Sequence, residues 1–186
     1  MSGTLQQMVA QHRLNLAITY NPTSQRNLKC LPLLEEPLYL IGPSNSPFAN
    51  RSEITVDEVL KLPLVLPEEK HGLRMKIERE ADQRGITLNL ALEVSAWPLL
   101  TDTARRGLGY TILPSAAVHE MVARKEVIAI PITSEMTRTL ALVTPVDLPA
   151  SVATGKLADL IMQQVAQHVR DGLWKGRLLF DADKLV

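Results

Sequence analysis

An α/β domain with parallel strands is the fold class that the sequence predicts. Segments with helical spacing alternate with short apolar runs along the 186 residues, and many of these runs end at a proline or glycine. Hydrophobic residues make up 46% and charged residues 22% of the chain, as in an ordinary globular protein. Length and composition together predict one domain or two small lobes.

The spacing of apolar residues predicts where helices and strands lie. Thr55 and Glu58 have the spacing of a capping box and predict that a helix begins there. Leu73, Ile77 and Ala81 repeat at helical spacing. Further helices are expected at 2–11, 72–84, 97–106, 115–124 and 151–173. Strands are expected at 14–20, 31–34, 38–41, 64–66, 88–94, 110–113, 127–130 and 138–143.

Three of these expectations include burial. The run 14–20 is predicted to be covered on both faces. The strand 88–94 alternates, which places Leu88, Leu90, Leu92 and Val94 on one apolar face. The last helix has one apolar stripe, formed by Leu157, Leu160, Ile161, Val165, His168 and Val169. The segment that follows, from Trp174 to Val186, is expected to be a partly disordered tail.

Charge and cysteine content exclude several classes of function. Lysine and arginine together number 20, as do aspartate and glutamate, so this chain lacks the basic excess that phosphate contacts require. Cys30 is the only cysteine, which excludes an internal disulfide and a cysteine metal site and indicates a reducing, cytoplasmic compartment. The first residues do not resemble a signal peptide, and no apolar run reaches the roughly 18 residues of a membrane span. No cofactor and no membrane partner are expected.

Isolated motifs carry little chemistry. Gly107-Leu108-Gly109 lacks the third glycine of a phosphate loop and is interpreted as a helix end. The four histidines are not paired at metal-ligand spacing; His168 is expected to be half-buried, and His71 begins a helix where a ligand is possible. Cys30 is interpreted as an inert buried thiol and Ser115 as a helix cap. The pairs Glu35-Glu36 and Glu68-Glu69 point to opposite sides of an extended chain, which predicts solvated edges rather than a catalytic site.

Three strand-to-helix loops are more informative: 20–22, 67–72 and 95–97. In open α/β sheets ligands bind beyond the carboxyl ends of strands, where helix N-termini present free N–H groups to anions. Ser95 supplies a hydroxyl there and Trp97 a flat apolar wall. The alternative is that these are ordinary loops with a cap and a core tryptophan.

The order of segments resembles the sensor domain of LysR-type transcription regulators. HRLNLAITY is similar to the family's helix-to-strand stretch, although Asn15 stands where aspartate is usual, and LPLLEEPLYLIGPSNSPF is similar to the block that follows. ITVDEVLKLPLVLP resembles the helix and strand that open the second lobe, and RTLALVTP the returning strand. The most specific block is EVSAWPLLTDTARRGLGYTILP. The resemblance covers residues 3–174, and some details resemble the nitrogen assimilation control branch.

The resemblance implies a fold like type II periplasmic binding proteins, with two Rossmann-like lobes joined by two crossover strands near 38–43 and 140–145. The first lobe would combine 1–43 with 137–175, the second would span 44–136, and 176–186 would be a tail. Family members carry about fifty further first-lobe residues and a helix-turn-helix before this point, so the first lobe is expected to be incomplete and DNA binding to depend on a domain outside this chain.

The implied function is effector sensing by a homodimer or tetramer, without enzymatic activity, catalytic residues or a metal. By position in the motifs, the small-molecule effector would contact Tyr20, Asn21, His71, Gly72, Ser95, Ala96, Trp97 and Pro114. The helix 72–84 is a plausible dimer contact. Two alternatives stay open: a type II solute-binding protein that carries a small anionic ligand, and an α/β enzyme acting through residues such as Ser95, His71 and Glu68.

Overall fold

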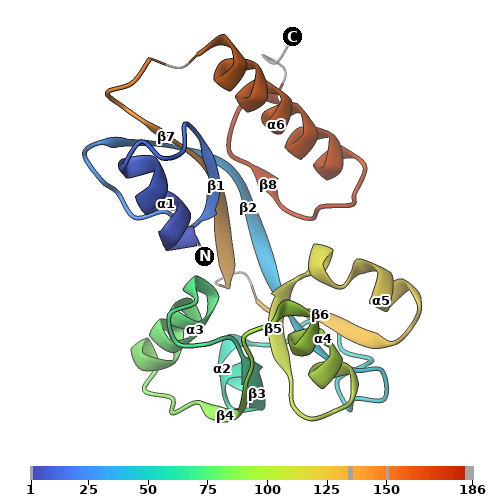
Figure 1. Cartoon of the computed structure of the whole chain (residues 1–186). Coiled ribbons are helices and arrows are strands. Elements are labelled where there is room, and N and C mark those ends of the chain that lie inside the picture. The colour runs from blue at the N-terminus through green and yellow to red at the C-terminus, as the bar shows by residue number, and fades with distance from the viewer. Residues whose placement is uncertain (1, 134–135, 150, 183–186) are drawn as a thin grey trace. The chain divides into compact units, whose positions relative to one another are not determined.

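The computed structural model describes residues 2–133, 136–149 and 151–182. The chain forms two compact units (Figure 1). Unit 1 consists of Met1–Glu36 and Arg138–Val186, and unit 2 of Pro37–Thr137. Two strands, β2 (Leu28–Pro43) and β7 (Thr137–Pro145), continue from one unit into the other.

Unit 1 is built on an antiparallel sheet. Besides its parts of β2 and β7 it contains α1 (Ser2–Ala10), β1 (Ala17–Tyr20), α6 (Val152–Arg170) and β8 (Arg177–Leu178). The strand β1 pairs with β7, with Tyr20 opposite Leu140. On the other side of β7 lies β2, which pairs with β8. The strands here are antiparallel where the sequence predicted parallel ones, because β7 returns from the other unit instead of following a crossover helix.

Each face of this sheet has its own small apolar cluster. Val9 of α1 packs with Ala17, Leu28 and Val143 on one face. On the other face Val165 of α6 packs with Leu33, Leu140 and Leu142, and Leu34 belongs to the same cluster. Neighbouring residues such as Leu142 and Val143 serve opposite faces because side chains alternate along a strand.

Unit 2 has a mixed sheet and one larger core. Its elements are α2 (Val56–Leu60), β3 (Pro63–Leu66), α3 (Gly72–Gln83), β4 (Asn89–Glu93), α4 (Trp97–Arg105), β5 (Thr111–Pro114), a 3-10 turn (Ser115–Ala117), α5 (His119–Ala123) and β6 (Val127–Pro131). The strands β3 and β4 are parallel, whereas β5 and β6 pair antiparallel with β2. The core combines residues of β2, β3, β5 and β6 with buried side chains of α2, α3 and α4.

Several local predictions are confirmed. The Thr55 hydroxyl accepts the Glu58 N–H while the Glu58 side chain accepts the Thr55 N–H, which completes the capping box. Gly107 has φ +75° directly after α4 and marks a helix end rather than a phosphate loop. The predicted helix 72–84 corresponds closely to α3, in which Leu73, Ile77 and Ala81 are buried.

Two boundaries are corrected. The strand pieces at 31–34 and 38–41 form one strand, because the Leu38 N–H donates to the carbonyl of Met136 and pairing resumes directly after Pro37. The helix expected at 115–124 is divided by the buried Val118, whose φ of −127° and ψ of 11° are not helical. Ser115 caps nothing, because the residue at the N-cap position of the 3-10 turn is Pro114.

Burial was predicted less well than element type. One face of β1 is buried, and the other is covered only in part: Tyr20 packs against an apolar cluster there, but Ile18 is 40% exposed. All of β4 is exposed, with Leu90 and Leu92 at 40% each, so the expected apolar face is not buried within this chain.

The apolar stripe predicted for α6 is only partly buried. Val165 is buried and Ile161 and Val169 are half-buried, but Leu157 and Leu160 are exposed. His168 is exposed rather than half-buried, with Nδ1 2.7 Å from the Gln164 carbonyl oxygen. The expected tail contains β8, and residues 183–186 lie outside the described part of the chain.

Candidate functional site

In unit 2, three parallel strand ends meet at one edge of the sheet. The strand β3 ends at Leu66 beside Glu93, the last residue of β4. A parallel bridge joins Leu64 to Tyr110, directly before β5, so β5 runs in the same direction and ends at Pro114. The loops that lead into α3 and α4 therefore begin at a common edge, where ligands bind in open α/β sheets.

A histidine caps the N-terminus of α3. His71 has extended backbone geometry, and its Nδ1 accepts the Leu73 N–H at 3.2 Å. An imidazole that accepts at Nδ1 carries its proton on Nε2 when it is neutral. The next residue, Gly72, is exposed and has open space where a Cβ would be. A ligand can therefore approach the start of α3 without meeting a side chain at Gly72.

The N-terminus of α4 has no side-chain cap. The N-cap residue is Ala96, and Pro98 stands at the start of the helix. Ser95, Ala96 and Trp97 are all exposed, and Trp97 at 39% is not the core tryptophan of the alternative interpretation. Because no side-chain oxygen caps α4, backbone N–H groups at its start are available to donate to an external acceptor such as a carboxylate.

Arg74, which the sequence analysis did not select, lies beside the same loops. Its side chain is 8% exposed, and its Nε donates to the Glu78 Oε1 at 2.6 Å. Its Nη1 lies 3.5 Å from the Pro67 carbonyl oxygen and 3.9 Å from the Glu93 Oε2. Arg74 thus links the loop after β3 to the end of β4. An arginine in the first turn of a helix that follows a strand was the available signal.

The remaining candidates, Tyr20 and Asn21, lie in unit 1 at the end of β1. Asn21 has φ +46°, a left-handed conformation that asparagine tolerates better than most residues. Its N–H donates to the Thr139 carbonyl, and its Oδ1 accepts the Thr139 N–H, both at 2.8 Å. Asn21 therefore extends the pairing of β1 with β7 through its own side chain.

Tyr20 belongs to a polar cluster that the sequence analysis missed. The Arg138 guanidinium stacks on the Tyr20 ring, 3.6 Å from its centroid, and the Arg138 Nε donates to Glu36. Burial raises the pKa of Tyr20 to about 12; the Arg138 charge opposes this shift, and the charge and hydrogen bonding of Glu36 add to it. The phenol is therefore protonated at neutral pH. Glu36 is 1% exposed, which corrects the expectation of a solvated Glu35-Glu36 edge.

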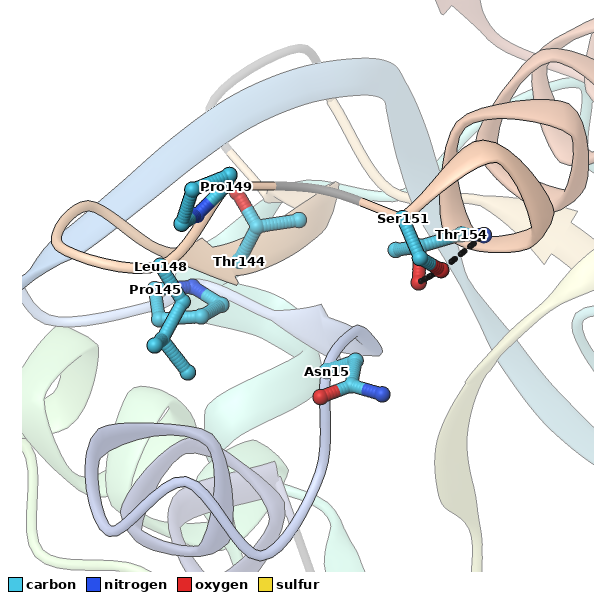
Figure 2. A pocket seen from close by; sticks show the side chains of 7 residues that line it. All are labelled: Asn15, Thr144, Pro145, Leu148, Pro149, Ser151 and Thr154. Carbon is cyan, nitrogen blue, oxygen red and sulfur yellow. Dashed lines mark hydrogen bonds between the residues drawn. The ribbon is translucent and has the colours of Figure 1, made fainter.

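The cavity drawn in Figure 2 also lies in unit 1 but contains none of the predicted residues. Its volume is about 150 Å³. It is lined by Asn15, Thr144, Pro145, Leu148, Pro149, Ser151 and Thr154. Asn15 precedes β1 and Pro145 ends β7, whereas Tyr20 ends β1, so the cavity lies at the opposite end of these strands from Tyr20. The Ser151 and Thr154 hydroxyls, 2.9 Å apart, already bond to each other there.

Other chemistry has little support among the described residues. No group of three or more histidine, cysteine, aspartate or glutamate side chains in the described ranges has an arrangement for holding a metal ion. Within the same ranges, none of the helices combines the length and apolarity of a membrane span. Cys30 is half-buried in β2, and burial raises the pKa of its thiol, which disfavours the reactive thiolate.

Comparisons with known proteins define the class. The regulatory domain of Synechocystis CcmR, solved in complex with 2-PG, superposes with a TM-score of 0.77 at 19% identity, over 88% of this chain and 79% of that one. The effector-binding domain of QuiR, solved with shikimate, gives a TM-score of 0.74 at 17% identity, over 89% and 78%. The chain therefore shares the fold of these two domains, which is like that of type II periplasmic binding proteins.

Sequence comparison gives the family. The LysR substrate binding domain matches residues 1–166, and the chain belongs to this family. It is 29% identical to the HTH-type transcriptional regulator BbuR of Bordetella bronchiseptica over 95% of this chain and 54% of that protein. It is 22% identical to the nitrogen assimilation regulatory protein nac of Escherichia coli over 91% and 55%. The chain thus spans about half the length of these relatives.

Proposed function

We propose that this chain is the effector-sensing and dimer-forming part of a bacterial LysR-type transcription regulator. Its relatives are transcription regulators, and the chain spans about half of their length. With 20 basic and 20 acidic side chains, the chain is poorly suited to hold DNA itself. DNA binding therefore belongs to a helix-turn-helix domain outside this chain, and the protein acts in the cytoplasm.

The observation that carries this proposal is the shared edge of β3, β4 and β5 in unit 2. Two helices begin there, and one of them, α4, lacks a side-chain cap. The proposed effector is a small anion whose carboxylate accepts N–H groups at Ala96–Trp97 and lies near His71, Gly72, Ser95 and Pro114. Tyr20 and Asn21 are its proposed contacts from unit 1. One structural relative was solved with shikimate, a hydroxylated carboxylate, which fits this class of ligand.

The proposed mechanism is a shift between two arrangements of two lobes, with the first lobe formed by 1–43 and 137–175 and the second by 44–136. An effector shifts such an equilibrium only by its difference in affinity for the two arrangements, commonly about 1–3 kcal/mol. The changed arrangement would be passed to the DNA-binding domains through the dimer.

A thermal-shift screen tests the effector proposal. The chain is screened against shikimate, amino acids, nucleobases and other small organic acids, and the compound with the largest rise in Tm is kept. Ala96→Glu places a negative charge at the start of α4 and should abolish that rise through repulsion. Ala96→Gln is the matched neutral control and should retain most of it. A rise in Tm that survives in Ala96→Glu contradicts an anion site at α4.

The second proposal concerns the homodimer, whose surface would be formed by α3 and β4. Met75 on α3 is 54% exposed, and Leu90 and Leu92 on β4 are each 40% exposed. Among the described strands, β4 pairs with β3 alone, so one of its edges is open. A second copy that lays α3 beside β4 would bury these side chains. A tetramer would require a further surface.

Light scattering after size exclusion tests the dimer. Leu92→Glu should shift the chain to the monomer, because it places a charge in the proposed interface. Val122→Glu is the matched control, since Val122 on α5 is similarly exposed at 39%. The dimer surface is wrong if Leu92→Glu remains dimeric, or if Val122→Glu dissociates as readily.

A free solute-binding protein has less support, because the sequence relatives are named as transcription regulators. An α/β enzyme also has less support, because the His71 ring caps α3 and the sequence relatives are named as transcription regulators.

A further inference from the structure

A buried carboxylate marks the place where β2 leaves unit 1. Glu36 is the last residue of unit 1 on β2, and Arg138 is the first residue of unit 1 on β7. The Arg138 Nε donates to the Glu36 Oε1, and these side chains are 9% and 1% exposed. The Trp174 Nε1 donates to the other oxygen, Oε2, at 2.6 Å. Each Glu36 oxygen therefore has a donor from a different segment.

The segment that follows α6 pairs with β2 beside this carboxylate. Leu178 pairs with Leu34 and Arg177 with Glu35. The Arg177 Nη2 lies 2.9 Å from the Glu35 Oε2. At Gly176 a Cβ would come within 2.6 Å of the Glu35 carbonyl oxygen, so the backbone is seated too closely for a side chain. This segment, 174–178, is called the C-terminal clamp below.

Arg138 connects the clamp to the proposed effector residues of unit 1. Its guanidinium stacks on the ring of Tyr20, and the adjacent Thr139 exchanges two hydrogen bonds with Asn21. A continuous series of contacts therefore runs from Trp174 through Glu36 and Arg138 to Tyr20 and Asn21. A buried ion pair holds one geometry strongly, because its charges lose much stabilisation when they separate in a low-dielectric site.

We propose that Glu36 and Trp174 are positioning residues of the effector site: through Arg138 they fix Tyr20 and Asn21, and so make the effector-binding end of β1 depend on the C-terminal clamp. The functional part of this inference rests on the proposed effector role of Tyr20 and Asn21. The positioning part does not, since it concerns contacts within unit 1.

Hydrogen exchange measured by mass spectrometry, without any ligand, tests the positioning part. Trp174→Phe keeps an aromatic ring but removes the indole donor to Glu36. Amides in peptides covering 18–22 and 138–141 should exchange about tenfold faster, the effect expected from losing one hydrogen bond to a charged group. Peptides from α6 and from β3 and α3 should be unchanged.

Trp97→Phe is the matched control, because it makes the same replacement at the exposed start of α4. It should leave exchange at 18–22 and 138–141 unchanged. Glu36→Gln is the second variant; it preserves the side chain's size but removes the charge that faces Arg138, and it should accelerate the same peptides. If Trp174→Phe does not fold, the result with Glu36→Gln decides.

Unchanged exchange at 18–22 and 138–141 in the folded variants overturns the proposal. So does an equal acceleration throughout unit 1, because that result indicates only a general loss of stability. Since no ligand is used, the clamp can be disproved while the effector proposal stands. Conversely, if no compound binds, the proposed link to an effector site is disproved, but the effect of Glu36 and Trp174 on Tyr20 and Asn21 can still hold.

Discussion

The two units are stabilised by different kinds of interaction. Unit 2 buries one continuous apolar cluster; Arg74 is also buried there, but its partner Glu78 is 36% exposed, and the pair of Arg51 with Glu58 lies at the surface. Unit 1 divides its apolar residues between two smaller clusters and leaves Leu160 on α6 51% exposed. Unit 1 also buries both partners of a charged pair, Glu36 and Arg138. The comparison indicates that apolar packing specifies unit 2, whereas unit 1 depends more on a few polar contacts at its strand ends.

The largest effect is expected at the buried pair. Glu36→Ala leaves the Arg138 charge buried without its carboxylate and should destabilise unit 1 by about 3–5 kcal/mol. Urea unfolding followed by Trp174 fluorescence in a Trp97→Phe background reports on unit 1, because the chain has two tryptophans, one in each unit. The control is Glu35→Ala, whose partner Arg177 is exposed, with an expected loss below about 1 kcal/mol. If Glu36→Ala and Glu35→Ala lose equal free energy of unfolding, unit 1 does not depend on the buried pair.

Truncation of a buried core residue should have the next largest effect. Leu66 is fully buried in unit 2, so Leu66→Ala should lower the free energy of unfolding by about 2–5 kcal/mol through lost burial and a residual cavity. The exposed Leu160→Ala in unit 1 should change it by less than about 0.5 kcal/mol. Urea unfolding followed by circular dichroism measures both. A substantial loss in Leu160→Ala would show that α6 packs more closely than its exposure indicates.

The smallest effect concerns a surface contact of unit 2. Hydrogen bonds from Arg51, and then from Thr55, lower the pKa of Glu58 to about 2. A carboxylate with a lowered pKa stabilises the fold above its usual pKa of about 4.5, and this contribution disappears as the pH falls towards 2. Arg51→Ala should therefore flatten the fall in Tm between those pH values.

The control for this acid dependence is Arg124→Ala, which removes an exposed ion pair to Glu120 on α5 without touching Glu58. Its Tm should fall with pH as steeply as that of the unmodified chain. If Arg51→Ala falls equally steeply, the Arg51 contact does not set the titration of Glu58.

Sequence reasoning succeeded where the signal was local. The capping box of Thr55 and Glu58 spans three residues, and the buried face of α3 follows from helical spacing. The candidate loops after β3 and β4 could likewise be predicted, because strand-to-helix transitions are visible in the sequence. The family resemblance added the order of the blocks, and the family match over residues 1–166 confirms it.

The missed features depend on partners distant in the sequence. Glu36 meets Arg138 at a separation of 102 residues and Trp174 at a separation of 138. No periodicity encodes such contacts, although an acidic residue inside an apolar strand was a warning of a buried pair. The exposure of β4 was missed for a similar reason, since alternation indicates an apolar face but not whether the same chain covers it.

The proposed function depends most on the recognition of a small anion at the edge where α3 and α4 begin. Hydrogen exchange with and without the carboxylate that raises Tm most tests it directly. If the anion binds there, we expect slower exchange in peptides covering 67–73 and 95–98 of unit 2 and at Tyr20–Asn21 of unit 1. Protection confined to the residues around Asn15 and Ser151–Thr154, with none at 95–98, would contradict it.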